Sequence, residues 1–85
     1  MKIVDKALER FSLPPELAGE ARVILSGARI LSVENHRGLL EYSEDYILVA
    51  IKGGNMAIRG NRLSLAAMER ESLVIRGNIT GIDME

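Results

Sequence analysis

Two hydropathy patterns divide the chain. Near its start, the apolar positions recur at spacings of three and four with charged residues between them; they are Ile3, Val4, Ala7, Leu8 and Phe11. This period predicts a short amphipathic helix. Pro14 and Pro15 end it, because a proline disfavours helical backbone in the residue before it. We expect a helix and connector over residues 1–19, with the helix packed on the domain or docked on a partner, and a β domain over residues 20–85.

From Ala21 onward the apolar runs become short and rich in β-branched residues, and turn dipeptides separate them about every seven to ten residues. The predicted fold is all-β: a curled antiparallel meander of about seven or eight short strands, closing as a small sandwich, roll or barrel. Each dipeptide is interpreted as a hairpin loop, and the loops are Gly27-Ala28, Asn35-His36, Glu44-Asp45, Gly53-Gly54, Gly60-Asn61 and Gly77-Asn78.

The predicted loops also predict a core. Residues that flank a two-residue loop oppose each other and share one face of the sheet. All the loops but the last together place one set of apolar residues on a continuous face: Ile24, Leu31, Val33, Leu40, Tyr42, Ile47, Val49, Ile51, Met56, Ile58, Leu63 and Leu65. A slip of one residue would scatter this set, so the agreement supports the register.

A short motif of aliphatic, basic, glycine and asparagine residues repeats along the chain. It occurs at Ile58-Arg59-Gly60-Asn61 and Ile75-Arg76-Gly77-Asn78, with a looser copy at Ile51-Lys52-Gly53-Gly54-Asn55. The spacings define no regular repeat. We interpret the motif as turn chemistry, because glycine and asparagine tolerate positive φ.

Composition narrows the function classes. The chain has 85 residues, 47% of them hydrophobic and 27% charged, which predicts one folded domain. It has no Cys, so disulfides and thiolate metal sites are excluded. The net charge of −1 gives no general attraction to nucleic acid or to an anionic membrane. The longest apolar run, Tyr46 to Ile51, is too short to span a membrane, and the start of the chain lacks a signal-peptide core, so we expect neither a span nor export.

Few residues are suited to catalysis. The one histidine, His36, lies at a predicted hairpin tip, where we expect it to be solvated. It has no second histidine or cysteine to complete a zinc site or a nucleophile pair. The glycines at Gly53-Gly54-Asn55 lack the Lys-Ser/Thr that a phosphate loop requires. Glu69-Arg70-Glu71 is interpreted as an exposed turn. We therefore predict no catalytic residue, metal, cofactor or small-molecule substrate.

Arginines are expected to gather at one end of the sheet. Successive turns of a meander alternate between its ends, so the turns at Gly27, Glu44, Gly60 and Gly77 should share one end. The basic residues there are Arg29, Arg59, Arg62 and Arg76, partly offset by Glu44 and Asp45. This basic end suggests an alternative function, a small nucleic-acid-binding or anion-binding β-barrel. The scarcity of aromatic residues, one Phe and two Tyr, argues against base stacking and hence against nucleic acid.

Three segments carry a resemblance to a known family. They run from Val33 to Ser43 (VENHRGLLEYS), from Gly54 to Leu65 (GNMAIRGNRLSL) and from Leu73 to Ile79 (LVIRGNI). The chain resembles the YabP/YqfC family of sporulation proteins over nearly its whole length and looks most like the YqfC branch. The Glu-Asn-His-Arg-Gly turn is the most specific part of the likeness.

The resemblance implies a non-enzymatic protein of an endospore-forming bacterium. Such a protein would act through protein contacts in assembly of the spore envelope, coat or cortex, from the mother-cell side. Its partners would be membrane or coat-assembly proteins. Independently of the resemblance, an open meander has two edge strands and an apolar second face, both of which invite a partner, so we predict a homo-oligomer or a sporulation protein partner, with a membrane-bound partner as one alternative. The location would be the mother-cell cytoplasm, peripheral to the forespore membrane through that partner. The family-like turn is the candidate interaction loop, with Glu34 and Arg37 paired across it; its residues are Glu34, Asn35, His36, Arg37 and Gly38.

Overall fold

The computed structural model describes residues 18–85, which form one antiparallel sheet of six strands and no helix. The strands are β1 (Arg22–Ser26), β2 (Ile30–Glu34), β3 (Gly38–Tyr42), β4 (Tyr46–Ile51), β5 (Gly54–Met68) and β6 (Ser72–Met84). The all-β prediction is confirmed, but the expected seven or eight strands are six. The N-terminal helix falls outside the described residues, and the domain boundary at residue 20 stays a prediction.

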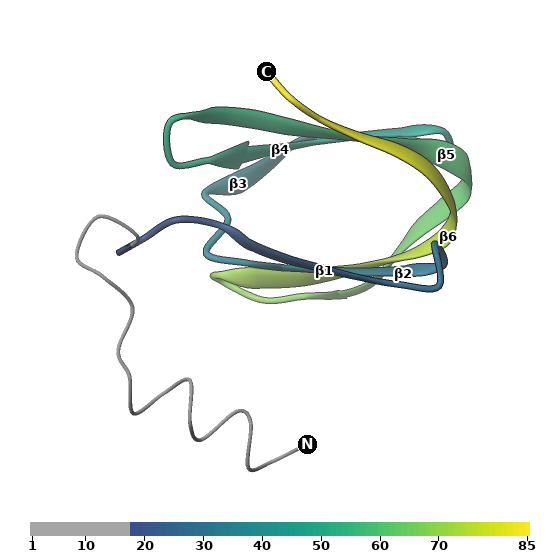
Figure 1. Cartoon of the computed structure of the whole chain (residues 1–85), viewed down its shortest axis with the longest axis horizontal. Helices are drawn as coiled ribbons and strands as arrows, with labels where there is room; N and C mark the ends of the chain where they lie inside the picture. Colours follow the sequence, from purple (N-terminus) through teal and green to yellow (C-terminus); the bar gives the residue numbers. More distant parts are fainter. Residues whose placement is uncertain (1–17) are drawn as a thin grey trace, which may run out of the picture.

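The sheet folds over on itself into two layers (Figure 1). β5 and β6 are the long strands, at 15 and 13 residues, and each runs through both layers. The first half of β5 and the second half of β6 lie with β4 and β3, in what we call the β4 layer. The other two halves lie with β2 and β1, in the β2 layer. The strand order is β1-β2-β6-β5-β4-β3.

The two long strands bend at their Gly-Asn dipeptides. Gly60-Asn61 and Gly77-Asn78 were predicted to be hairpin loops, and this prediction is wrong. They lie inside β5 and β6, where Asn61 opposes Asn78. A Cβ on Gly77 would lie 2.6 Å from the carbonyl oxygen of Arg62, and one on Gly60 would collide with the carbonyl oxygen of Asn78. Glycine therefore lets the two backbones pass close enough to bend together. Between β5 and β6 the chain reverses at residues 69–71, which form the exposed turn that was expected.

The chain is also not a simple meander, because β2 pairs with β6 and not with β3. The expected hairpin at Asn35-His36 is therefore wrong. Residues 35–37, which we call the crossover loop, carry the chain from β2 to β3 at the far side of the sheet. The sequence predicted a hairpin here because a turn dipeptide has the same composition whether the strand after it pairs with the strand before it or joins the opposite margin of the sheet.

The core lies between the two layers and is aliphatic. Its buried residues are Leu31, Val33, Ile47, Val49, Met56, Ile58, Leu63, Leu73, Ile75 and Ile79, with Val23, Leu39, Ile51, Leu65 and Ile82 packed against them. The predicted face is confirmed except for Ile24, Leu40 and Tyr42, which are about half exposed.

Small errors in register explain these exceptions. The loop between β1 and β2 has three residues, so Leu25 opposes Leu31, and Ile24 turns to the outer face. In β3 a register shift at Leu40 turns Leu39 inward in its place. Between β4 and β5 the loop is Lys52-Gly53, which moves the pairing by two residues and keeps the buried face unchanged. Tyr42 opposes Ile47, as predicted, but lies in an edge strand.

The sheet has two similar halves, because at each margin a two-strand hairpin pairs with one of the long strands. The hairpin of β1 and β2 pairs with β6 through β2, as the hairpin of β3 and β4 pairs with β5 through β4. The turn before β4 accepts hydrogen bonds from β5, Gly60 N to Asp45 O at 3.1 Å and Leu63 N to Glu44 O at 2.7 Å. The turn before β2 does the same for β6: Gly77 N donates to Arg29 O at 3.0 Å and Ile79 N to Ala28 O at 2.9 Å. The repeated Ile-Arg-Gly-Asn motif therefore occupies matching places in the two halves, which the turn-chemistry interpretation missed.

Candidate functional site

The crossover loop fastens one end of the domain by its backbone. The amides of Asn35 and His36 donate to the carbonyl oxygen of Glu71, at 2.6 and 3.3 Å, in the turn between β5 and β6. The amide of Arg37 donates to the carbonyl oxygen of Ala50 in β4, at 2.7 Å. The loop thus joins the end of the β2 layer to the β4 layer.

His36 points inward from this loop and is 5% exposed, which contradicts the expected solvated tip. Its Nδ1 accepts a hydrogen bond from the amide of Gly38 at 3.1 Å. Nε2 therefore carries the ring proton, which it donates to the carbonyl oxygen of Glu69, 3.1 Å away. Both nitrogens serve backbone groups, so in this arrangement neither is available to a substrate or a metal.

Asn35 positions the loop from the other side. Its φ of 65° lies in the left-handed region, which asparagine tolerates better than most residues. Its Nδ2 donates to the carbonyl oxygen of Glu20 at 3.0 Å. Lys52 makes a similar contact nearby, its Nζ donating to the carbonyl oxygen of Ala18 at 2.8 Å. The two side chains anchor the segment that leads into β1.

The charged members of the candidate interaction loop do not pair with each other. Glu34 pairs with Arg22 of β1 at 3.5 Å instead of Arg37, because Arg22 opposes Glu34 across the β1–β2 ladder. Arg37 is exposed. The loop thus presents Arg37 to solvent while Asn35 and His36 hold the backbone. Its role in binding a partner stays a prediction.

The segments predicted to share the basic end do meet there, at the bend of the sheet. The hydrogen bonds from Gly60 and Leu63 bring the Glu44-Asp45 turn to β5, and those from Gly77 and Ile79 bring the Gly27–Arg29 turn to β6. Arg29, Arg62 and Arg76 are exposed, and no carboxylate among residues 18–85 forms an ion pair with them. Glu44 and Asp45 are exposed at the same end, so both signs of charge are present.

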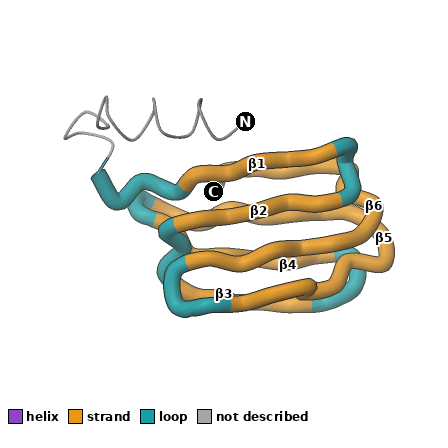
Figure 2. Tube along the Cα trace, turned by 90° about the horizontal axis from the view of Figure 1, so that it is seen from below, coloured by secondary structure: helices purple, strands orange, loops and turns teal. Residues whose placement is uncertain are grey.

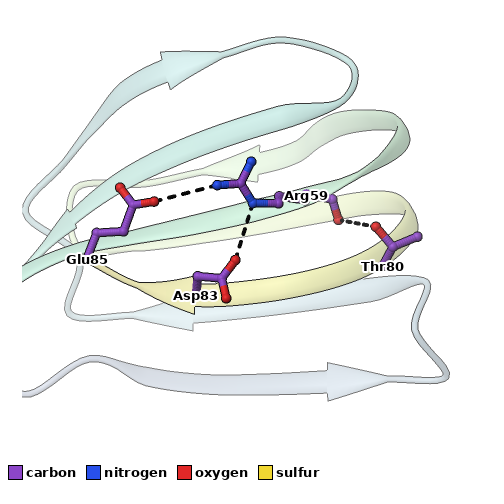
Figure 3. Close-up of polar contacts among 4 residues, drawn as sticks. All are labelled: Arg59, Thr80, Asp83 and Glu85. Carbon is purple, nitrogen blue, oxygen red and sulfur yellow. Dashed lines mark hydrogen bonds and ion pairs between the residues drawn. The ribbon is translucent and has the colours of Figure 1, made fainter.

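Arg59 is engaged differently from the other arginines of the basic end (Figure 3). Its Nε lies 3.2 Å from Asp83 Oδ2, and its Nη2 lies 3.7 Å from Glu85 Oε2. Its guanidinium carbon lies 5.0 Å from the ring centroid of Tyr46. Thr80 donates through Oγ1 to the carbonyl oxygen of Arg59 at 3.2 Å, beside a register shift in the ladder. These contacts tie the last part of β6 to β5, a role that the sequence did not reveal because Asp83 is 24 residues away.

A search for chemistry elsewhere in the described chain finds little. Residues 18–85 contain no group of three or more His, Cys, Asp or Glu placed to hold a metal ion. Over the same residues, every buried side-chain nitrogen and oxygen has a hydrogen-bond partner. No helix in this part of the chain has the length and apolar character needed to cross a bilayer.

The described chain is thus an all-β domain in which a folded sheet is closed by a histidine-containing loop. Residues 18–85 match the model of the YabP family, and the chain belongs to that family, which confirms the resemblance. It is similar to the uncharacterized protein YqfC of Bacillus subtilis strain 168, with 32% identity over 77 residues. That alignment covers 89% of this chain and 80% of the relative. No solved structure matches the chain.

Proposed function

We propose that this chain is a sporulation protein that acts through protein contacts, in assembly of the spore envelope on the mother-cell side. Membership of the YabP family over residues 18–85 supports the link to sporulation. The similarity to YqfC of Bacillus subtilis, at 32% identity over 77 residues, is consistent with that membership.

The observation that carries the proposed mode of action is the distribution of exposed apolar side chains. Most of the large ones lie on or beside the edge strands: Ile24 and Leu25 in β1, Ile30 in β2, and Leu40 and Tyr42 in β3. Exposed apolar side chains at the edge of a sheet are typical of a site where another protein binds. His36, the residue best suited to catalysis, is committed to backbone groups.

The test is genetic. In the native spore-forming host, a fluorescent reporter fused to the promoter of this gene should be active in the mother cell after asymmetric division and silent in vegetative growth. Deletion of the gene should lower the titre of heat-resistant spores by at least about tenfold, with a defect visible in the coat or cortex. A copy of the wild-type gene at a second locus should restore the titre.

A single variant distinguishes loss of an apolar contact surface from loss of the folded protein. Leu40→Lys places a charge on an exposed position of β3, where the register shift already turns the side chain outward. If apolar contacts carry the function, this variant should accumulate as a folded protein and still lower the spore titre. Constitutive expression combined with normal spores in the deletion strain would refute the proposed function.

A further inference from the structure

The two edge strands of the sheet differ in their protection against pairing with another strand. Figure 2 shows β1 and β3 at opposite margins of the sheet. Edge strands expose unpaired backbone groups, and proteins commonly protect them with bulges, charges or prolines. β3 has a register shift at Leu40 and a charge at Glu41. β1 pairs regularly with β2 at all its positions and carries one charge, at its first residue, Arg22.

Within residues 18–85, β1 also leaves apolar surface uncovered on both of its faces. On the inner face, Leu25 opposes the buried Leu31 but is itself 46% exposed, since no further strand of the described chain continues the row. On the outer face, Ile24 is 50% exposed and lies near Ile30 of β2, which is 39% exposed. The core therefore ends at β1 on an apolar margin that one more strand would cover.

The sequence of β1 is complementary to itself in antiparallel orientation. We propose that β1 pairs with β1 of a second copy of this chain, about a twofold axis at Ile24, which joins two six-stranded sheets into one. In this register Ile24 opposes the partner's Ile24, and Val23 opposes the partner's Leu25 on the inner face. Arg22 opposes the partner's Ser26, so no like charges face each other.

Competing arrangements fit less well. Any other antiparallel register of β1 with itself pairs fewer of its residues. Pairing of β3 with itself about Leu40 would set Glu41 opposite the partner's Leu39, and the register shift would break the ladder. The β1 pair is also closed by its symmetry, whereas β1 against β3 would leave free edges and grow into a filament. The proposal does not depend on the role in sporulation, so the two can fail separately.

The test uses the purified full chain in sedimentation equilibrium, at about 5 to 500 µM, because a contact through one short strand is small and its dimer weak. The wild-type chain should pass from monomer to dimer within this range. Ile24→Lys sets two ammonium groups against each other at the axis and should weaken the dimer at least tenfold. Leu40→Lys is the matched control, since it adds the same charge to the other edge at a similarly exposed position, and it should leave the dimer unchanged.

Two further variants test the register. Ile24→Cys should form a disulfide-linked dimer under mild oxidation, since directly opposed residues lie about 4.5–5.5 Å apart, within disulfide range. The natural chain has no cysteine, so Leu40→Cys is a clean control that should stay uncrosslinked. Ser26→Glu would face the partner's Arg22 twice in the dimer and should tighten it by about threefold.

Three results would overturn the proposal. The first is a wild-type chain that stays monomeric at every concentration, which would mean that β1 is covered in some other way or does not pair with a second copy. The second is a dimer that survives Ile24→Lys. The third is assembly that grows beyond a dimer and is lost in Leu40→Lys, which would assign the contact to β1 against β3. Circular dichroism and urea midpoints of the variants exclude unfolding as the cause.

Discussion

Nε2 of His36 lies 3.1 Å from the carbonyl oxygen of Glu69, a residue 33 positions further along the chain. Through this bond the crossover loop holds the turn between β5 and β6, and through Nδ1 it holds the start of β3 at Gly38. One buried ring therefore connects the crossover loop and the start of β3 to a turn 33 positions later in the sequence.

Removal of this ring should destabilise the domain. His36→Ala leaves the amide of Gly38 and the carbonyl of Glu69 without their partner and opens a cavity, which should lower the free energy of unfolding by about 2–3 kcal/mol. Urea unfolding followed by circular dichroism measures the change. Arg37→Ala, in the same loop but exposed, should cost less than about 0.5 kcal/mol. Equal midpoints for the two variants would show that the ring does not hold the domain together.

Asn35 offers a way to separate backbone strain from side-chain bonding. Asn35→Gly and Asn35→Ala both lose the hydrogen bond to the carbonyl of Glu20, but only alanine is strained at a φ of 65°. The glycine variant should therefore be more stable than the alanine variant by about 1 kcal/mol. Unfolding midpoints in urea decide the order, and an alanine variant as stable as the glycine variant would contradict the left-handed backbone.

The two glycines at the bend of the long strands, Gly60 and Gly77, should tolerate no side chain. Gly77→Ala would set a Cβ against the carbonyl of Arg62, and Gly60→Ala would set one against the carbonyl of Asn78. Each change should cost about 3 kcal/mol or more, and loss of the folded state would also satisfy the prediction. In Gly81→Ala the new Cβ meets nothing within 4 Å, so its melting temperature should stay close to that of the wild type. A folded Gly77→Ala protein that melts with the control would show that the strands do not pass as closely as described.

The cluster around Arg59 should contribute modestly and in a salt-dependent way. Arg59→Ala removes the ion pair with Asp83, the longer one with Glu85 and the contact with Tyr46, at a cost of about 1 kcal/mol because Arg59 is half exposed. A double-mutant cycle with Asp83→Asn should return a coupling below about 1 kcal/mol that shrinks at high salt. A coupling that high salt leaves unchanged would mean that the pair is shielded from solvent.

The buried face could be predicted from the sequence because alternation is a local property. A side chain keeps its face when the pairing slips by two residues, as it does between β4 and β5. Prediction failed where one extra residue entered a loop or a strand, as at Ile24 and Leu40. It also failed at the two Gly-Asn dipeptides, since the same residues that form a hairpin loop also let a long strand bend.

The arrangement of the strands and the role of His36 could not be predicted, because both depend on distant residues. Pairing of β2 with β6 and the bond from His36 to Glu69 are set by the docking of whole hairpins. One signal was present: asparagine and glycine on either side of the His36-Arg37 pair are residues that adopt positive φ, as Asn35 and Gly38 do. That pattern is as typical of a loop pinned by its backbone as of an exposed hairpin tip.

The pairing of β2 with β6 also sets the order in which the domain can assemble. Each residue of β2 pairs with a β6 residue roughly 40 positions later in the chain, whereas β3, β4 and β5 pair with strands that directly follow or precede them in the sequence. During synthesis the β4 layer can therefore begin to form while β1 and β2 still lack the strand that receives them. Until β6 is made, the aliphatic residues of β1 and β2 are exposed to every other chain emerging nearby, a vulnerability to aggregation built into the order of the strands.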